Sequence, residues 1–132
     1  MRFVTAALGL IWVTGVQAQP VQGLADATTF GAVATLAPLC GLRDETWSFD
    51  LRRAALQAAT GSTATSDADL LAAPDSGKAE AALGYADMEV LEDLAADTPA
   101  AMCAALRANP ALGRADAAVA AFRRQRDGKP VG

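Results

Sequence analysis

Apolar residues recur at intervals of three and four along most of the chain, the spacing of one face of an α-helix. No stretch shows the strict alternation that marks a half-buried strand. Ala, the strongest helix former, is frequent in these segments, and β-branched residues are few. The pattern predicts an all-α protein, a compact irregular bundle of about five helices, over residues 24–36, 45–60, 76–96, 99–108 and 111–126, with a short helical turn over residues 67–73.

Local signals place the ends of these helices. Thr98-Pro99 is the sharpest, because Thr caps helix N-termini and Pro is favoured at the first helical position. Asp44 can cap the second helix, and Gly61 suits its C-terminal end. Pro38 disfavours helical geometry in the residue before it, so we expect the first helix to end there.

Each predicted helix has one apolar face that we expect to form the core. Gly84 lies inside the longest helix at a cost of about 1 kcal/mol relative to Ala, which favours a close helix crossing there. Arg52 and Arg53 are expected to point to solvent. The expected core residues are Phe30, Val33, Ala34 and Ala37 in the first helix, Trp47, Leu51, Ala54, Ala55 and Ala58 in the second, Ala79, Ala82, Leu83, Ala86, Met88, Val90, Leu91 and Leu94 in the longest, and Leu112, Ala115, Val119 and Phe122 in the last.

The N-terminus has the pattern of a secretory signal peptide. Arg2 precedes an uncharged, mostly apolar run over residues 4–16, and small residues occupy both ends of Val16-Gln17-Ala18. A bilayer-spanning helix needs about 20 apolar residues, so an uncleaved anchor is the weaker alternative. We therefore expect a signal peptide over residues 1–18, a single helical domain over residues 19–132, and no stable membrane anchor after cleavage.

Composition narrows the classes of function. The 52% hydrophobic content includes 33 Ala, and the chain has no His, which excludes His-based catalysis and His metal ligands. A net charge of −4 and 5% aromatic residues argue against a nucleic-acid partner. Nine Arg against two Lys, with so much Ala, suggests a GC-rich bacterial genome. With the signal peptide, this predicts a periplasmic or secreted protein.

The two cysteines, Cys40 and Cys103, are predicted to form one disulfide, because an exported chain meets an oxidising compartment. In the chain-entropy model such a loop is worth about 4 kcal/mol. The alternatives are two separate thiols or a redox-active pair, although redox pairs usually have the spacing Cys-x-x-Cys.

No catalytic, cofactor-binding or metal-binding motif is recognised. The chain has no Gly-x-Ser-x-Gly, no phosphate loop, and only the first residues of a calcium loop, at Asp67 and Asp69. The arginines near the C-terminus suit the negative end of a helix as exposed cations, or else an acidic partner or a membrane surface, although three charges are few for membrane binding. An acidic run can be a solvated face, a weak cation site, or an acid/base pair if one member is buried. The arginines are Arg123, Arg124 and Arg126, and the acidic run is Asp87, Glu89, Glu92 and Asp93.

The most distinctive segment is residues 40–47, which joins a cysteine, a turn, a helix cap and a tryptophan. Trp47 can pack beside a disulfide, with Arg43 over its ring. This is a folding corner, or else a docking surface centred on Arg43 and Trp47, since both residue types are enriched in binding hot spots.

These observations predict a non-enzymatic helical protein that binds another exported protein, as an accessory subunit or a small chaperone. No cofactor is expected. The first alternative is a carrier of a small apolar ligand, because helices lined with Ala can leave a cavity. The second is an enzyme that uses the carboxylates of the acidic run.

Overall fold

The computed structural model describes the backbone of residues 15–96 and 98–128, with side chains over residues 26–93 and 98–128. All regular secondary structure in these ranges is helical, which confirms the all-α prediction. The predicted signal peptide lies largely outside the described residues and stays a prediction. The helices are α1 (Gly15–Leu39), α2 (Glu45–Thr60), α3 (Asp67–Ala72), α4 (Ser76–Ala96), α5 (Pro99–Ala108) and α6 (Pro110–Asp127).

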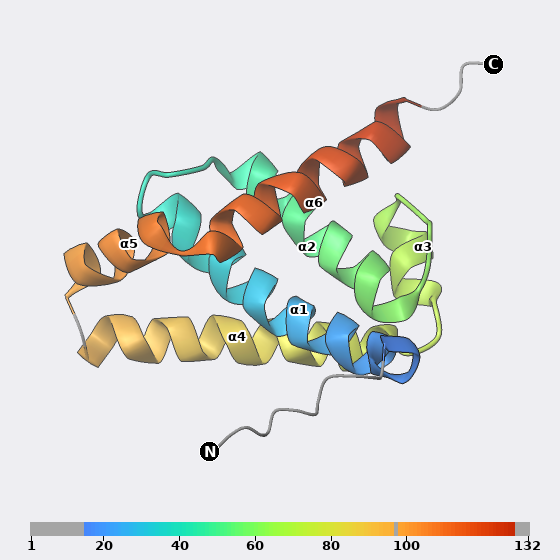
Figure 1. Ribbon diagram of the computed structural model, residues 1–132, viewed down its shortest axis with the longest axis horizontal. Coiled ribbons are helices and arrows are strands. Elements are labelled where there is room, and N and C mark those ends of the chain that lie inside the picture. Colours follow the sequence, from blue (N-terminus) through green and yellow to red (C-terminus); the bar gives the residue numbers. More distant parts are fainter. Residues whose placement is uncertain (1–14, 97, 129–132) are drawn as a thin grey trace.

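Helix α1 is the centre of the fold (Figure 1). It packs mainly against α2 and α4, and it also contacts α5 and α6. Helix α6 crosses over α2, while the short α3 bridges the ends of α2 and α4. In the described part of the chain, no helix is long and apolar enough to span a membrane.

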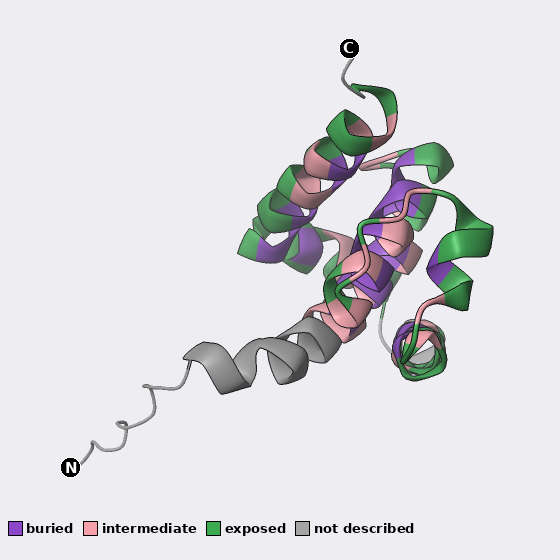
Figure 2. Ribbon diagram, turned by 90° about the vertical axis from the view of Figure 1, so that its right-hand side faces the viewer, coloured by how far each residue is buried: buried purple, intermediate pink, exposed green. Residues whose placement is uncertain are grey.

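The buried residues lie on the inner faces of these helices (Figure 2). Many are Ala, Val and Leu, with Phe30, Trp47 and Phe122 as the large members. The expected core faces of α1 and α6 are both buried, with Phe122 only 1% exposed. The inner face of α2 is confirmed except for Ala58, which is exposed. In α4, Met88 and Leu91 are exposed, so the apolar stripe is narrower than expected.

A close crossing exists, but at a different glycine from the one expected. A Cβ atom added at Gly31 of α1 would lie 3.0 Å from the Cβ of Ala86 and 3.1 Å from a methyl carbon of Leu83, both on α4. A Cβ at Gly84 would have no neighbour within 4 Å. The prediction for Gly84 is therefore wrong, because that residue lies on the exposed side of α4.

The prediction that Pro38 ends the first helix is also wrong, since α1 continues to Leu39. The helix ends in a Schellman motif, in which the Leu42 N–H donates to the Ala37 carbonyl and the Gly41 N–H donates to the Pro38 carbonyl. Gly41 has a φ of 69°, the left-handed conformation this motif requires. Ala37 is completely buried, so core packing outweighs the backbone bias imposed by Pro38.

The first helix also begins earlier than predicted, at Gly15 and not at Leu24. The predicted caps of the other helices are confirmed. Asp44 accepts a hydrogen bond from the Trp47 N–H at 2.8 Å, and Thr98 accepts one from the Ala101 N–H. Gly61 ends α2 with a φ of 75°. These boundaries depend on neighbouring residues only, so a local sequence pattern could find them.

Cys40 and Cys103 form the predicted disulfide, with a Cα–Cα distance of 5.5 Å. Cys40 follows the last residue of α1, and Cys103 lies inside α5. The disulfide therefore joins the central helix to α5 and encloses α2, α3 and α4 in the covalent loop.

Candidate binding surface

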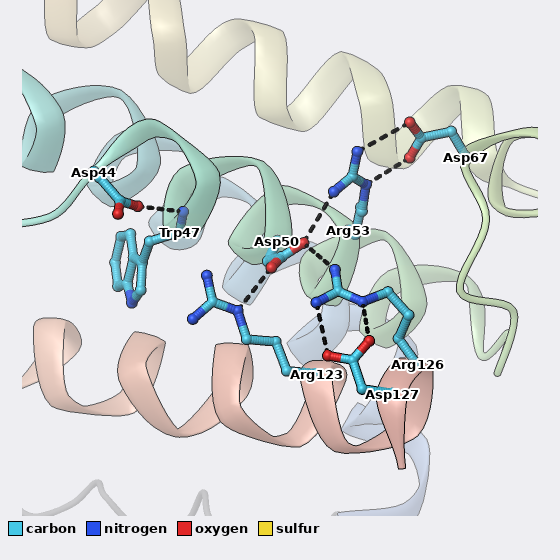
Figure 3. A network of polar contacts seen from close by, with 8 residues as sticks. All are labelled: Asp44, Trp47, Asp50, Arg53, Asp67, Arg123, Arg126 and Asp127. Carbon is cyan, nitrogen blue, oxygen red and sulfur yellow. Dashed lines mark hydrogen bonds and ion pairs between the residues drawn. The ribbon is translucent and has the colours of Figure 1, made fainter. Parts of the chain in front are cut away.

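A buried carboxylate, absent from the sequence predictions, organises the contact between α2 and α6 (Figure 3). Asp50 of α2 is 0% exposed and accepts hydrogen bonds from three guanidinium groups. Arg53 donates from its own helix at 2.9 Å, and Arg123 and Arg126 donate from α6 at 2.8 and 2.9 Å. Asp50 thus ties α6 to α2.

Electrostatics keep this carboxylate ionised. Burial acts to raise the pKa of Asp50, but the three guanidinium groups outweigh it and hold the pKa below its ordinary value. Since the carboxylate is enclosed and its oxygens already accept three hydrogen bonds, it has no free path to a substrate. We assign Asp50 a structural role.

The arginines near Asp50 differ from the sequence predictions. Arg123 and Arg126 pair with the buried Asp50 while their side chains stay 40% and 36% exposed, so of the three only Arg124 matches the expectation of a simple exposed cation. Arg52 and Arg53 do not simply point to solvent either. Their side chains are 27% and 29% exposed, and each forms ion pairs with aspartates. Sequence spacing alone did not reveal these partners, most of which lie on other elements.

The corner at Arg43 and Trp47 is tied inward to α6. Arg43 donates to both carboxylate oxygens of Asp116, at 2.9 and 2.7 Å, and the Trp47 indole N–H donates to the same carboxylate at 3.0 Å. The Arg43 guanidinium carbon lies 5.5 Å from the centre of the Trp47 ring. Trp47 is only 7% exposed, so the predicted docking surface offers a partner little of this ring. That docking hypothesis stays a prediction.

The acidic run divides into one paired and three exposed carboxylates. Asp87 forms an ion pair with Arg52 and accepts a hydrogen bond from the Thr35 hydroxyl. Glu89, Glu92 and Asp93 are exposed, which removes the burial expected of an acid/base pair. In the described residues, no Lys or Arg pairs with these three, and no acidic cluster is suited to hold a metal ion.

An open groove of about 390 Å³ lies between α1, α4 and α5. Val33 and Leu36 of α1, Val90 of α4, and Met102 and Leu106 of α5 give it an apolar lining. Two members of the acidic run, Glu89 and Asp93, also line it. The groove is an apolar surface bordered by carboxylates.

Helix α4 carries further exposed apolar side chains. Tyr85, Met88 and Leu91 are 58%, 61% and 58% exposed. Met88 was expected in the core, but it lies two residues from both Ala86 and Val90, which places it on the opposite side of the helix. Tyr85 lies one helical turn before Glu89 and therefore beside the groove, and the Glu89 carboxylate raises the pKa of Tyr85.

The groove and Tyr85 at its edge form the candidate binding surface, whereas Met88 and Leu91 lie on the far side of α4 from the groove. The sequence showed its acidic residues, but it gave no sign of the groove, which depends on where the disulfide places α5. The chain matches no protein-family profile, no curated protein and no solved structure.

Proposed function

We propose that this is a non-enzymatic binding or accessory protein of the bacterial periplasm that engages another exported protein. The observation that carries the proposal is the candidate binding surface, in which an open apolar groove is bordered by exposed carboxylates and by the exposed Tyr85 of α4. Contiguous exposed apolar surface marks interaction sites in soluble proteins.

Two features support export. The N-terminal residues have the charge, apolar run and small residues of a signal peptide. Cys40 and Cys103 are joined, and such bonds persist in oxidising compartments.

Two features favour binding over catalysis. Asp50, the buried carboxylate, already has three arginine partners. The carboxylates at the groove are exposed, and such groups rarely acquire the shifted pKa that acid/base work at neutral pH requires.

The groove also supports a second candidate, a carrier of a small apolar ligand, because ligand sites have volumes of about 300–1,000 Å³. The groove is open to solvent, whereas such sites usually enclose most of the ligand. The open shape of the groove therefore favours a protein partner over a small ligand.

The test uses photo-crosslinking in the cells that produce the protein. A benzoylphenylalanine placed at Tyr85, beside the groove, should give one dominant protein adduct, and the same residue at Ala120, exposed on α6, should not. Equal adducts from both positions, or none from Tyr85, would contradict a protein partner. Co-purification of a small apolar compound with the unlabelled protein would instead favour the carrier.

A further inference from the structure

The shape of the groove suits a helix of the partner. Its apolar lining comes from three helices, with no strand edge offered for pairing by the described residues. In helix-in-groove recognition, an amphipathic helix places its apolar face in such a groove. Met102 contributes to the lining, and its flexible side chain can adapt to the occupant.

The charge of the groove is one-sided. Among the side chains described at the groove, two are acidic, Glu89 and Asp93, and none is Lys or Arg. By contrast, the carboxylates that face other helices, Asp50, Asp87 and Asp116, each pair with an arginine of this chain. A cation for the groove must therefore come from another molecule.

The acidic residues also oppose the dipole of α4. The last turn of α4 has no basic residue, and its first turn has no acidic one, the reverse of the favourable arrangement. Asp93 lies in that last turn, where a negative charge destabilises the helix. Helix stability does not account for an acid at this position, whereas a cationic partner does.

We infer that the groove binds an amphipathic helix of the partner protein that carries Lys or Arg beside its apolar face. The apolar side chains of that helix pack on Val33, Val90 and Leu106, and its cations pair with Glu89 and Asp93. Tyr85 adds an aromatic face beside Glu89 for one cation. This inference rests on the proposed function and names the chemistry of the partner.

The probe is a pair of fluorescent amphipathic peptides of about 14 residues, roughly 20 Å long as helices. Both have the same Leu and Ala face, flanked by Lys in one peptide and by Glu in the other. Fluorescence anisotropy with the disulfide-bonded protein should show at least tenfold tighter binding of the Lys peptide. Added salt should weaken this binding.

Matched variants assign the binding to the groove. Glu89→Lys with Asp93→Lys should abolish the preference for the Lys peptide. Glu80→Lys with Glu92→Lys makes the same change in net charge on exposed α4 positions outside the groove and should keep most of it. Ala105→Phe fills the groove from an exposed position of α5 and should weaken binding without reversing the charge preference.

Three outcomes would overturn the inference. Equal losses in the two charge variants would show general attraction to an acidic protein. Equal binding of both peptides would show that charge plays no part. Failure of both peptides, while the Tyr85 crosslink still captures a protein, would leave the proposed function standing and remove the cationic helix.

Discussion

Helices α5 and α6 follow each other in the chain, but they are held to the molecule in different ways. Helix α6 buries five side chains, and two of its arginines reach the carboxylate of Asp50. Helix α5 buries one described side chain, Leu106, and is joined to the end of α1 by the disulfide. One helix is held by packing and internal ion pairs, and the other mainly by a covalent bond.

The difference shows which part of the molecule leaves apolar and charged surface exposed. Around α6 the charges of the chain are largely satisfied within the chain. Around α5 the groove and the neighbouring face of α4 keep apolar side chains and carboxylates exposed. A covalent attachment holds α5 without covering that surface.

The largest effect is expected from removing the disulfide. Cys40→Ser or Cys103→Ser should each lower the free energy of unfolding by about 4 kcal/mol, because the unfolded chain gains entropy. Calorimetry should show the melting temperature fall by roughly ten to twenty degrees. Hydrogen exchange should increase in α5 more than in α6.

The double variant should lose no more than either single one, since both remove the same bond. Two free thiols in the unfolded, unreduced protein would contradict the disulfide. Equal loss of protection in α5 and α6 would contradict the comparison between the helices.

The next effect is expected at the α6 side. Asp50→Asn removes the charge that three arginines share and should lower the free energy of unfolding by about 3 kcal/mol, as breaking buried ion pairs does. Urea denaturation measures the loss. A loss below about 1 kcal/mol would show that packing alone holds α6.

The pH dependence of stability provides the control for the Asp50→Asn variant. The pKa of Asp50 is lower in the folded state, so its contribution is fully present above the ordinary carboxyl value of about 3.9 and is lost as pH falls below it. The pKa of Asp116 is also lowered, chiefly by its hydrogen bond with Arg43. Stability should therefore decrease below about pH 4, and less steeply in the Asp50→Asn variant.

A smaller effect is expected where α1 crosses α4. Gly31→Val should destabilise the protein by about 2 kcal/mol, because the added atoms overlap Ala86 and Leu83. Gly84→Ala has open space and should stabilise it by up to about 1 kcal/mol. Thermal denaturation of both variants tests this, and equal effects would show no close crossing.

The smallest effect is a gain in the free energy of unfolding, whereas the change at Asp50 causes a loss. Asp93→Asn removes a negative charge from the last turn of α4 and should stabilise the protein by roughly 0.5 kcal/mol in the absence of a partner. Urea denaturation at low salt measures the gain. A loss of stability would mean that Asp93 has an internal role like that of Asp50.

Local structure was predictable because its causes are local. Thr98-Pro99, Asp44 and Gly61 act within one turn of the helix end they define, so their residue types sufficed. The disulfide followed from the cysteine count and the signal peptide. Pro38 was misleading because a local bias was judged without the buried Ala37 beside it.

The Asp50 cluster was not predicted because its partners are remote. Arg123 and Arg126 lie 73 and 76 positions from Asp50. One sign was present in the sequence, since Asp50 lies three residues from Trp47 and four from Ala54, on a face otherwise read as apolar. A carboxylate on such a face, together with unassigned arginines elsewhere, indicates a buried ion pair.

The disulfide also fixes how far the molecule can be stretched. A force applied between the two ends passes from Cys40 directly to Cys103 and bypasses the 63 positions that separate them. At about 3.3–3.6 Å per extended residue, roughly 210–230 Å of contour length cannot be extended by the force while the disulfide is intact. Helices α2, α3 and α4 are therefore shielded from mechanical unfolding until the bond is reduced.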